Sequence, residues 1–280
     1  MKKILFAFGF ALAACSHNPT PPPPPAAPET RPIVIGEQRI VHAAALGDDR
    51  EINVWLPPSY SKSDRRYPVV YLIDGALDQD FEHIAGLAQY GALSWIFEEL
   101  IVVGVQTKDR RAELTWRSTD PAENRDFPTN GNSAAFRKFL TGEVKPLIDA
   151  KYRTSGEDAL MGESLAGLFI VETFLKHPDA ADSFIAISPS LWWDYGSLGK
   201  DAKKILGDFP KGEREIYLAI ASEKGAMREG VLALVAGLKK QKPKGVAWTF
   251  SDRPDLQHAT IYHREALEAL VWAFPREAGE

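Results

Sequence analysis

Six short apolar runs recur along the chain, and helix-like segments separate them. The runs cover residues 69–73, 101–106, 159–161, 184–188, 215–220 and 246–250. Runs this short and this continuously apolar are typical of parallel strands that are buried on both faces of a sheet. Apolar residues at helical spacing in 231–238 and 265–274 fit the connections between such strands. The alternation predicts an α/β architecture, in which helices cover both faces of a mostly parallel sheet and ligands bind at the carboxyl ends of its strands.

Two further runs precede this alternating region. Residues 33–46 and 51–56 flank the turn signal Gly47-Asp48-Asp49, so we expect an antiparallel hairpin at one edge of the sheet. Between the second and third runs, Gly142 and Pro146 interrupt an otherwise helical pattern. Because proline cannot donate the helical hydrogen bond, we expect a break or a kink there.

The segment Gly162-Glu163-Ser164-Leu165-Ala166-Gly167 joins one of the apolar runs to a helix-like stretch at 168–176. A serine between small residues at a sharp turn from strand to helix is typical of a nucleophile elbow, which exposes the hydroxyl above the edge of the sheet. Such a string alone arises by chance in roughly one chain of this size in five. The strand and helix on either side make Ser164 our candidate nucleophile.

A serine nucleophile needs a general base, which in elbow-containing folds comes after the serine and after the acid. Among the six histidines, His258 follows the last apolar run and precedes the last helix-like segment, which is the expected position. His263 is the nearest alternative, but it is expected to open the final helix, where a capping or surface role is more common. We therefore assign the candidate base to His258.

The acid that would orient the imidazole has three candidates. Glu223 is the first carboxylate after the run at 215–220, where the acid is expected, whereas Asp252 and Asp255 lie in the loop that leads to His258. We favour Glu223, and a dyad without an acid also stays open. In a working triad, loss of the acid lowers the rate by about 10⁴.

An oxyanion hole needs two backbone amides directed at the developing negative charge. The amide of Leu165, the residue after the nucleophile, is the first candidate. The second should follow the run at 69–73, where Asp74-Gly75-Ala76 forms a turn, and we choose the amide of Ala76.

The amino-terminal residues predict export and lipidation. Lys2 and Lys3 precede an apolar stretch that ends in Leu12-Ala13-Ala14-Cys15, the pattern of a bacterial lipoprotein signal. We expect residues 1–14 to be a signal peptide and Cys15 to carry the lipid; the alternative is an ordinary secretory signal. Ser16 is typical of lipoproteins that are passed to the outer membrane. The expected location is therefore the bacterial cell envelope, with a lipid anchor in the outer membrane and the domain facing the periplasm.

Residues 15–32 follow as a proline-rich tether, with five consecutive prolines at 21–25. Such a run favours polyproline II and cannot join a packed core. A ligand for a proline-binding partner is the alternative for this segment. Residues 33–280 are long enough for one large α/β domain.

Net charge is acidic, −5 for the chain as written and more negative once Lys2 and Lys3 leave with the signal peptide. This argues against nucleic acid as a partner. Cys15 is the single cysteine, so intramolecular disulfides are excluded.

Taken together, these motifs resemble the esterase family that includes esterase D and the enterochelin esterases, especially its periplasmic siderophore-esterase branch. The resemblance covers nearly the whole domain. Its carriers are Tyr71-Leu72-Ile73-Asp74-Gly75, Arg111-Ala112-Glu113-Leu114-Thr115, the elbow, Ser188-Pro189-Ser190-Leu191-Trp192-Trp193 and His258-Ala259-Thr260. The resemblance implies the α/β-hydrolase fold, a serine nucleophile, and neither metal nor cofactor.

Three positions depart from the family pattern. Glu163 stands where the family usually has histidine or glutamine, Ala166 stands where it usually has glycine, and residues 221–224 lack its usual glycine.

Aromatic and basic residues near the strand ends are candidates for substrate binding. Trp192 and Trp193 follow the run at 184–188 and are expected to stack on a flat acyl group, although a packing pair is an equal alternative. Trp116 and Arg111, with Arg110 and Arg117 beside them, follow another strand and suit an anionic substrate. A surface loop is the alternative for these residues.

The function expected from these residues is serine-dependent hydrolysis of a small-molecule carboxylic ester, siderophore-like or with a small acyl group. A carbohydrate esterase or an envelope acyltransferase is the second possibility, because one fold serves many acyl chemistries. A non-catalytic binding lipoprotein is the third, and it predicts that Ser164 and His258 lie too far apart to bond. The oligomeric state stays open.

Overall fold

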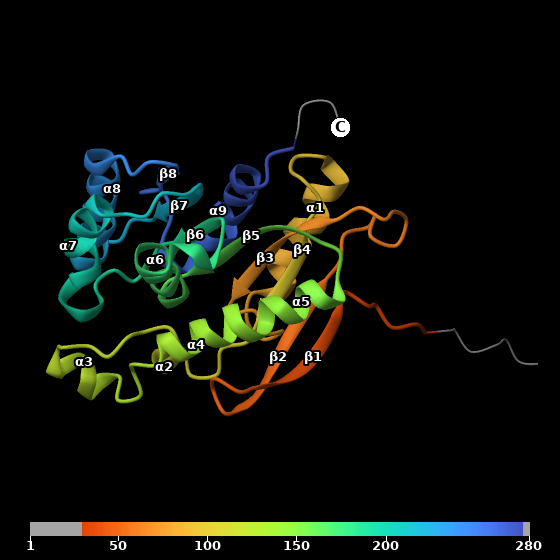
Figure 1. Ribbon diagram of the computed structural model, residues 1–280, viewed down its shortest axis with the longest axis horizontal. Helices are drawn as coiled ribbons and strands as arrows, with labels where there is room; N and C mark the ends of the chain where they lie inside the picture. Colours follow the sequence, from red (N-terminus) through yellow and green to blue (C-terminus); the bar gives the residue numbers. More distant parts are fainter. Residues whose placement is uncertain (1–29, 277–280) are drawn as a thin grey trace, which may run out of the picture. The chain divides into compact units, whose positions relative to one another are not determined.

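A computed structural model describes residues 30–276 of the chain (Figure 1). Residues from Val34 onward group as one compact unit, and both hydrophobic cores lie within it. The predicted signal peptide, Cys15 and nearly all of the tether lie outside the described residues. Within 30–276, no helix combines the length and the apolar character needed to cross a bilayer.

In the described part of the chain, eight strands form one sheet in the order β1-β2-β4-β3-β5-β6-β7-β8. β2 runs antiparallel to both β1 and β4, and every other neighbouring pair is parallel. The predicted hairpin at the edge of a mostly parallel sheet is therefore confirmed. The strands are β1 (Glu37–Ala43), β2 (Asp48–Trp55), β3 (Tyr67–Ile73), β4 (Ile101–Val105), β5 (Thr154–Glu163), β6 (Ser183–Ile187), β7 (Arg214–Ile220) and β8 (Val246–Asp252).

β5 is longer than the apolar run that predicted it. Its last residues are buried, whereas Ser155, Gly156 and Glu157 near its beginning are exposed. The exposed residues are polar or glycine, so hydrophobicity alone could not reveal this part of the strand. β5 also extends beyond the apolar run at its other end, to Glu163, the residue directly before the candidate nucleophile.

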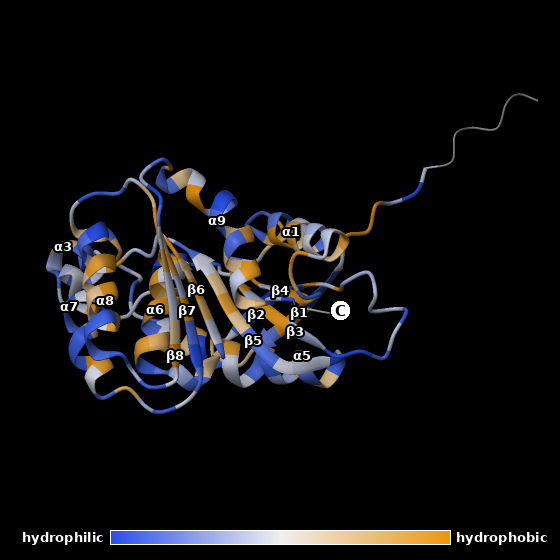
Figure 2. Cartoon of the chain, turned by 90° about the horizontal axis from the view of Figure 1, so that it is seen from above, coloured by the Kyte–Doolittle hydropathy of each residue, from blue (hydrophilic) through white to orange (hydrophobic). Residues whose placement is uncertain are grey.

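Helices cover both faces of the sheet, as the alternation predicts (Figure 2). α1 and α9 pack on one face and contribute Phe81, Ile84 and Ile261 to its core, while α4 to α8 cover the other face. The helical segments are α1 (Phe81–Ser94), α2 (Arg110–Glu113), α3 (Pro121–Asp126), α4 (Ser133–Phe139), η1 (Leu140–Val144), α5 (Lys145–Lys151), α6 (Leu165–Lys176), η2 (Pro178–Ala180), α7 (Trp193–Gly207), α8 (Ala226–Gln241) and α9 (His258–Ala273).

The break expected near Gly142 and Pro146 takes the form of a local change in helix type. α4 continues into the π-helical turn η1 and then into α5, which has Pro146 in its first turn. Because Pro146 has no N–H to donate to the carbonyl of Gly142, the hydrogen-bond ladder shifts by one residue instead of ending.

α9 begins earlier than the apolar spacing indicates, at His258 itself. The backbone amide of Gln257, the residue before the helix, donates to Thr260 Oγ1 at 3.1 Å. This capping bond fixes the start of α9. His258 is thereby held on a rigid element rather than on a free loop.

Candidate active site

Ser164 occupies a strained backbone position between β5 and α6. Its φ is 59° and its ψ is −115°, a region that residues other than glycine rarely enter. The turn is sharp because the helix packs directly on the strand: a Cβ built on Gly162 would lie 2.6 Å from the methyl of Ala166, and one on Gly167 would lie 3.0 Å from Pro189. Close packing of the helix on the strand therefore explains why the predicted elbow has small residues at these positions.

A chain of hydrogen bonds runs from Ser164 through His258 to Glu223. The Oγ of Ser164 lies 3.0 Å from Nε2 of His258, and Nδ1 of the same ring lies 2.8 Å from Oε1 of Glu223. The three residues follow β5, β8 and β7, whose carboxyl ends meet at one edge of the sheet. This is the geometry that a nucleophile, a general base and an orienting acid require.

The two other candidate acids are engaged elsewhere. Asp252 forms an ion pair with Arg228, and Asp255 forms one with Arg253 at 2.9 Å. Of the three carboxylates considered from the sequence, Glu223 is the one that bonds the His258 ring.

The environment of Glu223 keeps it ionised. Burial opposes the charged form, but hydrogen bonds from Ser188 and His258 outweigh this and hold the pKa of Glu223 below its ordinary value. An ionised carboxylate at this place orients the imidazole and stabilises its protonated form.

His263, the alternative base, lies one helical turn beyond His258 and contacts a different ring. Its imidazole lies edge-on to that of His83, with 4.4 Å between the ring centroids. Burial and the neighbouring His263 lower the pKa of His83.

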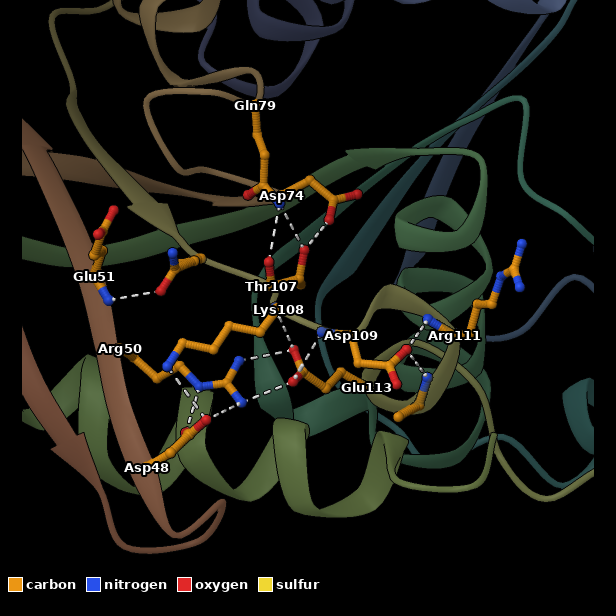
Figure 3. Close-up of polar contacts among 12 residues, drawn as sticks. Asp48, Arg50, Glu51, Asp74, Gln79, Thr107, Lys108, Asp109, Arg111 and Glu113 are labelled. Carbon is orange, nitrogen blue, oxygen red and sulfur yellow. Dashed lines mark hydrogen bonds and ion pairs between the residues drawn. The ribbon is translucent and has the colours of Figure 1, made fainter. Parts of the chain in front are cut away.

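The two candidate oxyanion amides differ in their present partners. Leu165 is the first residue of α6, so its amide has no acceptor within the helix. The amide of Ala76 donates to Oε1 of Gln79 at 2.9 Å. Nε2 of Gln79 in turn donates to the carbonyl of Thr107 at 3.0 Å (Figure 3). The Ala76 amide therefore has an acceptor that a bound substrate would have to replace.

A hollow of about 830 Å³ opens over Ser164 and His258. Two aromatic side chains, Phe127 and Trp192, line it, and the guanidinium of Arg111 lies 4.6 Å from the centroid of the Phe127 ring. Lys108, Arg110 and Met227 also line the hollow, and Asp109 is the one carboxylate in its described wall, against three basic side chains. The hollow therefore combines flat apolar surfaces with positive charge at the carboxyl ends of the strands.

Of the four residues predicted to bind substrate, two line this hollow and two do not. Arg111 and Trp192 belong to its wall. Trp193 is fully buried, and its indole N–H donates to the carbonyl of Trp116 at 3.1 Å, so it packs in the core. The indole N–H of Trp116 donates to Asp194 at 3.0 Å, beneath the loop rather than in the hollow. The two indole rings nevertheless pack together, with 5.9 Å between their centroids, and both contact the ring of Phe127. The alternative of a packing pair therefore describes them as well, with Trp192 half-buried at the hollow and Trp193 fully buried.

Ser190 adjoins the nucleophile and was not a candidate from the sequence. Its Oγ lies 3.3 Å from Oγ of Ser164, and its backbone amide donates to the Ser164 carbonyl at 2.9 Å. Ser190 follows β6, the strand beside β5. A polar residue directly after a strand that neighbours the elbow is the signal that could have identified it.

Glu163, the departure from the family pattern that adjoins the nucleophile, lies half-buried at the site. Burial raises its pKa to about 7, while the His258 imidazole acts in the opposite direction. Its Oε1 is buried without a hydrogen-bond partner in the part of the chain that the structure describes. A carboxyl that titrates near neutrality therefore lies beside the candidate base.

The fold and this site together define the class of protein. A mostly parallel sheet with a helix on each face, a serine at an elbow and a histidine after the last strand is the arrangement of an α/β hydrolase. Residues 43–246 match the sequence profile of a family described as "Putative esterase". The chain belongs to this esterase family, whose activity is the hydrolysis of carboxylic esters.

Individual relatives agree with the family. The chain is 23% identical over 251 residues to the ferri-bacillibactin esterase BesA of Bacillus subtilis, covering 82% of this chain and 87% of that protein. It is 26% identical over 245 residues to the apo-salmochelin esterase of Escherichia coli O6:H1, covering 79% and 74%. An IroE-like serine hydrolase from Shewanella oneidensis superposes with a TM-score of 0.77 at 26% identity, covering 85% of this chain and 80% of that one.

Proposed function

We propose that this esterase uses Ser164 as its nucleophile, His258 as general base and then acid, and Glu223 as the residue that orients the imidazole. Ser164 Oγ attacks the ester carbonyl while its proton passes to Nε2 of His258. The imidazolium then protonates the departing alcohol, which leaves an acyl-enzyme. Water, deprotonated by the same nitrogen, releases the acid and restores the serine. The observation that carries this proposal is the hydrogen-bond chain of 3.0 Å and 2.8 Å through the His258 ring.

The amides of Leu165 and Ala76 would hold the oxyanion that forms during both attacks. The amide of Leu165, which has no acceptor within α6, supports the first assignment. For the second, the incoming oxyanion would take the place of Gln79 Oε1 as the acceptor of the Ala76 amide. One such donor is worth roughly 3–4 kcal/mol of transition-state stabilisation.

The substrate class we propose is a siderophore-like or small acyl ester, with a flat, negatively charged group bound near the ester. Trp192 and Phe127 offer aromatic surfaces for stacking, and Lys108, Arg110 and Arg111 supply positive charge around the same hollow. The names of the relatives, ferri-bacillibactin esterase and apo-salmochelin esterase, support the same class.

The cellular location we propose is the periplasmic side of the bacterial envelope, with the domain held to the outer membrane by a lipid on Cys15. The support is the sequence Leu12-Ala13-Ala14-Cys15 after a short apolar stretch, and the proline-rich tether that follows it.

The test of the serine mechanism compares the wild type with Ser164→Ala. Hydrolysis of p-nitrophenyl acetate and butyrate is measured together with fluorophosphonate labelling, and the labelled peptide is mapped. We expect the variant to lose both signals and the label to lie on Ser164. A folded wild type that neither hydrolyses nor becomes labelled would favour the non-catalytic binding lipoprotein. That alternative predicts a separation of Ser164 and His258 that the 3.0 Å distance does not support.

A further inference from the structure

Four large apolar side chains gather where α1 ends. Tyr90, Leu93, Trp95 and Ile96 are exposed by 50%, 62%, 71% and 36%, and we refer to them as the α1-end patch. Tyr90 and Leu93 are three residues apart on one helix and therefore share a face. Elsewhere in the compact unit, Val34, Ile35 and Ile40 are exposed at and just before β1, and Leu77, Tyr195 and Leu232 lie far apart in the sequence. A concentration of this kind marks an interaction surface rather than chance exposure.

The backbone turns Trp95 outward. Trp95 caps α1 in the left-handed conformation, with φ of 53°, which a bulky residue rarely adopts. Phe97, two residues later, turns inward: it is buried, and its ring lies against Gly91, where a Cβ would overlap it. The larger of the two aromatic side chains is thus the one that faces solvent, in a strained position that packing alone does not require.

The chain enters the sheet, at the start of β1, at the end of the sheet where the α1-end patch lies. Glu37, the first residue of β1, pairs with Val54, and Trp55 of β2 pairs with Val102 of β4. β4 begins shortly after the α1-end patch in the sequence, so the patch and the start of β1 lie at the same end of the sheet. Val34, just before β1, is also exposed, by 77%.

Charge beside the patch is balanced. A hollow of about 460 Å³ includes Trp95 in its wall, together with Arg65, Arg276, Glu98 and Glu99. Two positive and two negative side chains give no net attraction to a polyanion, whereas tryptophan and tyrosine favour the boundary between lipid headgroups and acyl chains. The surface therefore fits a bilayer of largely zwitterionic phospholipid.

We propose that the α1-end patch docks the domain onto the phospholipid surface of the membrane that holds its lipid anchor. The choice of a bilayer as occupant rests on the proposed anchor at Cys15. The predicted tether begins at that lipid and enters the domain at the end of the sheet that carries the patch. Extended as polyproline II, residues 15–33 would reach roughly 55 Å, more than enough for the patch to touch the membrane.

Docking in this way fixes the direction of the active site. Ser164, His258 and Glu223 follow the carboxyl ends of their strands, whereas the α1-end patch precedes the amino end of β4. The two therefore lie at opposite ends of the sheet, roughly 20 Å apart. The hollow over Ser164 faces away from the bilayer, so the esters it takes come from the aqueous periplasm and not from membrane lipids.

The test uses the chain from Ser16 onward, made without lipid, so that any membrane binding comes from the protein surface. Both cores lie between Ala43 and Phe274, so the domain keeps its packing without the anchor. Binding to vesicles of phosphatidylethanolamine and phosphatidylglycerol is measured by co-sedimentation. We expect Leu93→Ser combined with Trp95→Ser to weaken binding at least tenfold, because two apolar side chains no longer leave water.

Leu232→Ser is the matched control, since Leu232 is an exposed leucine, 41% accessible, on α8. It should bind vesicles like the wild type, and all variants should hydrolyse p-nitrophenyl acetate equally. Brominated lipids should quench a tryptophan signal that is absent in Trp95→Phe. Added salt should change binding little.

Wild-type protein that fails to bind vesicles, or a double variant that binds as well as the wild type, would overturn the docking surface. The double variant could instead change the mass measured by sedimentation without vesicles and leave vesicle binding unchanged. The patch would then be a contact between copies of the chain, and the docking proposal would be overturned. Palmitate labelling of Cys15 in cells tests the anchor separately, and the Ser164→Ala assay tests the enzyme separately. If either of these two tests gives a negative result, vesicle binding still tests the docking surface.

Discussion

Arg50 on β2 and Glu113 on α2 form a two-bonded ion pair beneath the active-site hollow. Nη1 and Nη2 of Arg50 donate to the two carboxylate oxygens of Glu113 at 2.8 Å and 2.7 Å, and the side chains are only 4% and 5% exposed (Figure 3). Glu113 also accepts from the backbone amide of Lys108 at 3.1 Å. The pair therefore joins β2 to the loop that carries the basic residues of the hollow.

Replacing Glu113 with alanine should lower the free energy of unfolding by about 3–5 kcal/mol, because the Arg50 guanidinium would stay buried with one carboxylate partner fewer. Chemical denaturation measures this change. The exposed pair Arg125–Asp126 is the control, and Asp126→Ala should change stability by less than about 1 kcal/mol. Equal effects of the two substitutions would contradict the role of burial.

Glu223→Gln should lower kcat by about 10⁴ while leaving the fold intact, because a neutral amide neither fixes the imidazole tautomer nor stabilises the imidazolium. Asp255→Asn is the matched control, since Asp255 pairs with Arg253 and not with His258. It should retain nearly full activity. A large loss in Asp255→Asn with little loss in Glu223→Gln would reassign the acid.

Gln79→Glu should lower kcat at least tenfold with little change in KM. The new carboxylate would accept from the Ala76 amide in place of the present amide oxygen and would repel the oxyanion that should occupy this position. Gln79→Ala separates charge from shape, because it removes the competing oxygen without adding charge. Steady-state kinetics with p-nitrophenyl butyrate compares the three proteins, and unchanged kcat in Gln79→Glu would exclude Ala76 from the oxyanion hole.

Glu163→Gln should make stability less dependent on pH. The folded protein holds the Glu163 proton up to a pKa of about 7, against an ordinary value of 4.5. A group whose pKa is raised on folding contributes stability below the ordinary value and loses it as pH rises through the folded value. The wild type should therefore lose about 2–3 kcal/mol relative to Glu163→Gln between pH 4.5 and 8.

Denaturation curves at several pH values measure that difference, and Glu229→Gln, at an exposed position, is the control. The kinetics should respond in the same region. Glu163 gains its negative charge beside the base as pH rises through about 7, so the change that this charge makes to kcat/KM should be absent in Glu163→Gln. Parallel stability curves and the same pH profile of kcat/KM in both proteins would show that Glu163 does not titrate beside the base.

Arg111→Ala should lower kcat/KM for an ester with an anionic catechol group by about tenfold and leave hydrolysis of p-nitrophenyl acetate nearly unchanged. Arg111 lines the hollow but makes no contact with the three candidate catalytic side chains. Arg117→Ala is the control, because Arg117 lies outside that wall and interacts with the carbonyls of Pro128 and Asn130. Equal losses for both substrates would assign Arg111 a structural role instead.

Much of the fold and of the proposed triad follows from local sequence. Apolar runs identify strands that are buried on both faces, and the order of the chain places Ser164, Glu223 and His258 at one edge of the sheet. The sequence could not decide which carboxylate is the candidate acid of the triad. Asp252 and Asp255 are excluded because each pairs with an arginine, which their positions in the sequence do not reveal. Trp192 and Trp193 are adjacent aromatic residues after the same strand, so the sequence could not show that Trp192 lines the hollow while Trp193 is fully buried.

Positions 162 and 166 cannot vary independently. The methyl group of Ala166 and a Cβ at Gly162 would compete for one space, 2.6 Å apart, so the side chain that fits at either position depends on the other. Glycine at 166 would remove the 2.6 Å contact, and the next neighbours of a Cβ at 162 would be Ile170 at 3.3 Å and the carbonyl carbon of residue 166 at 3.4 Å. In a library randomised at both positions, active clones should carry pairs of side chains whose combined size fits this space. Making one side chain of a pair smaller should be tolerated, whereas making one larger should not.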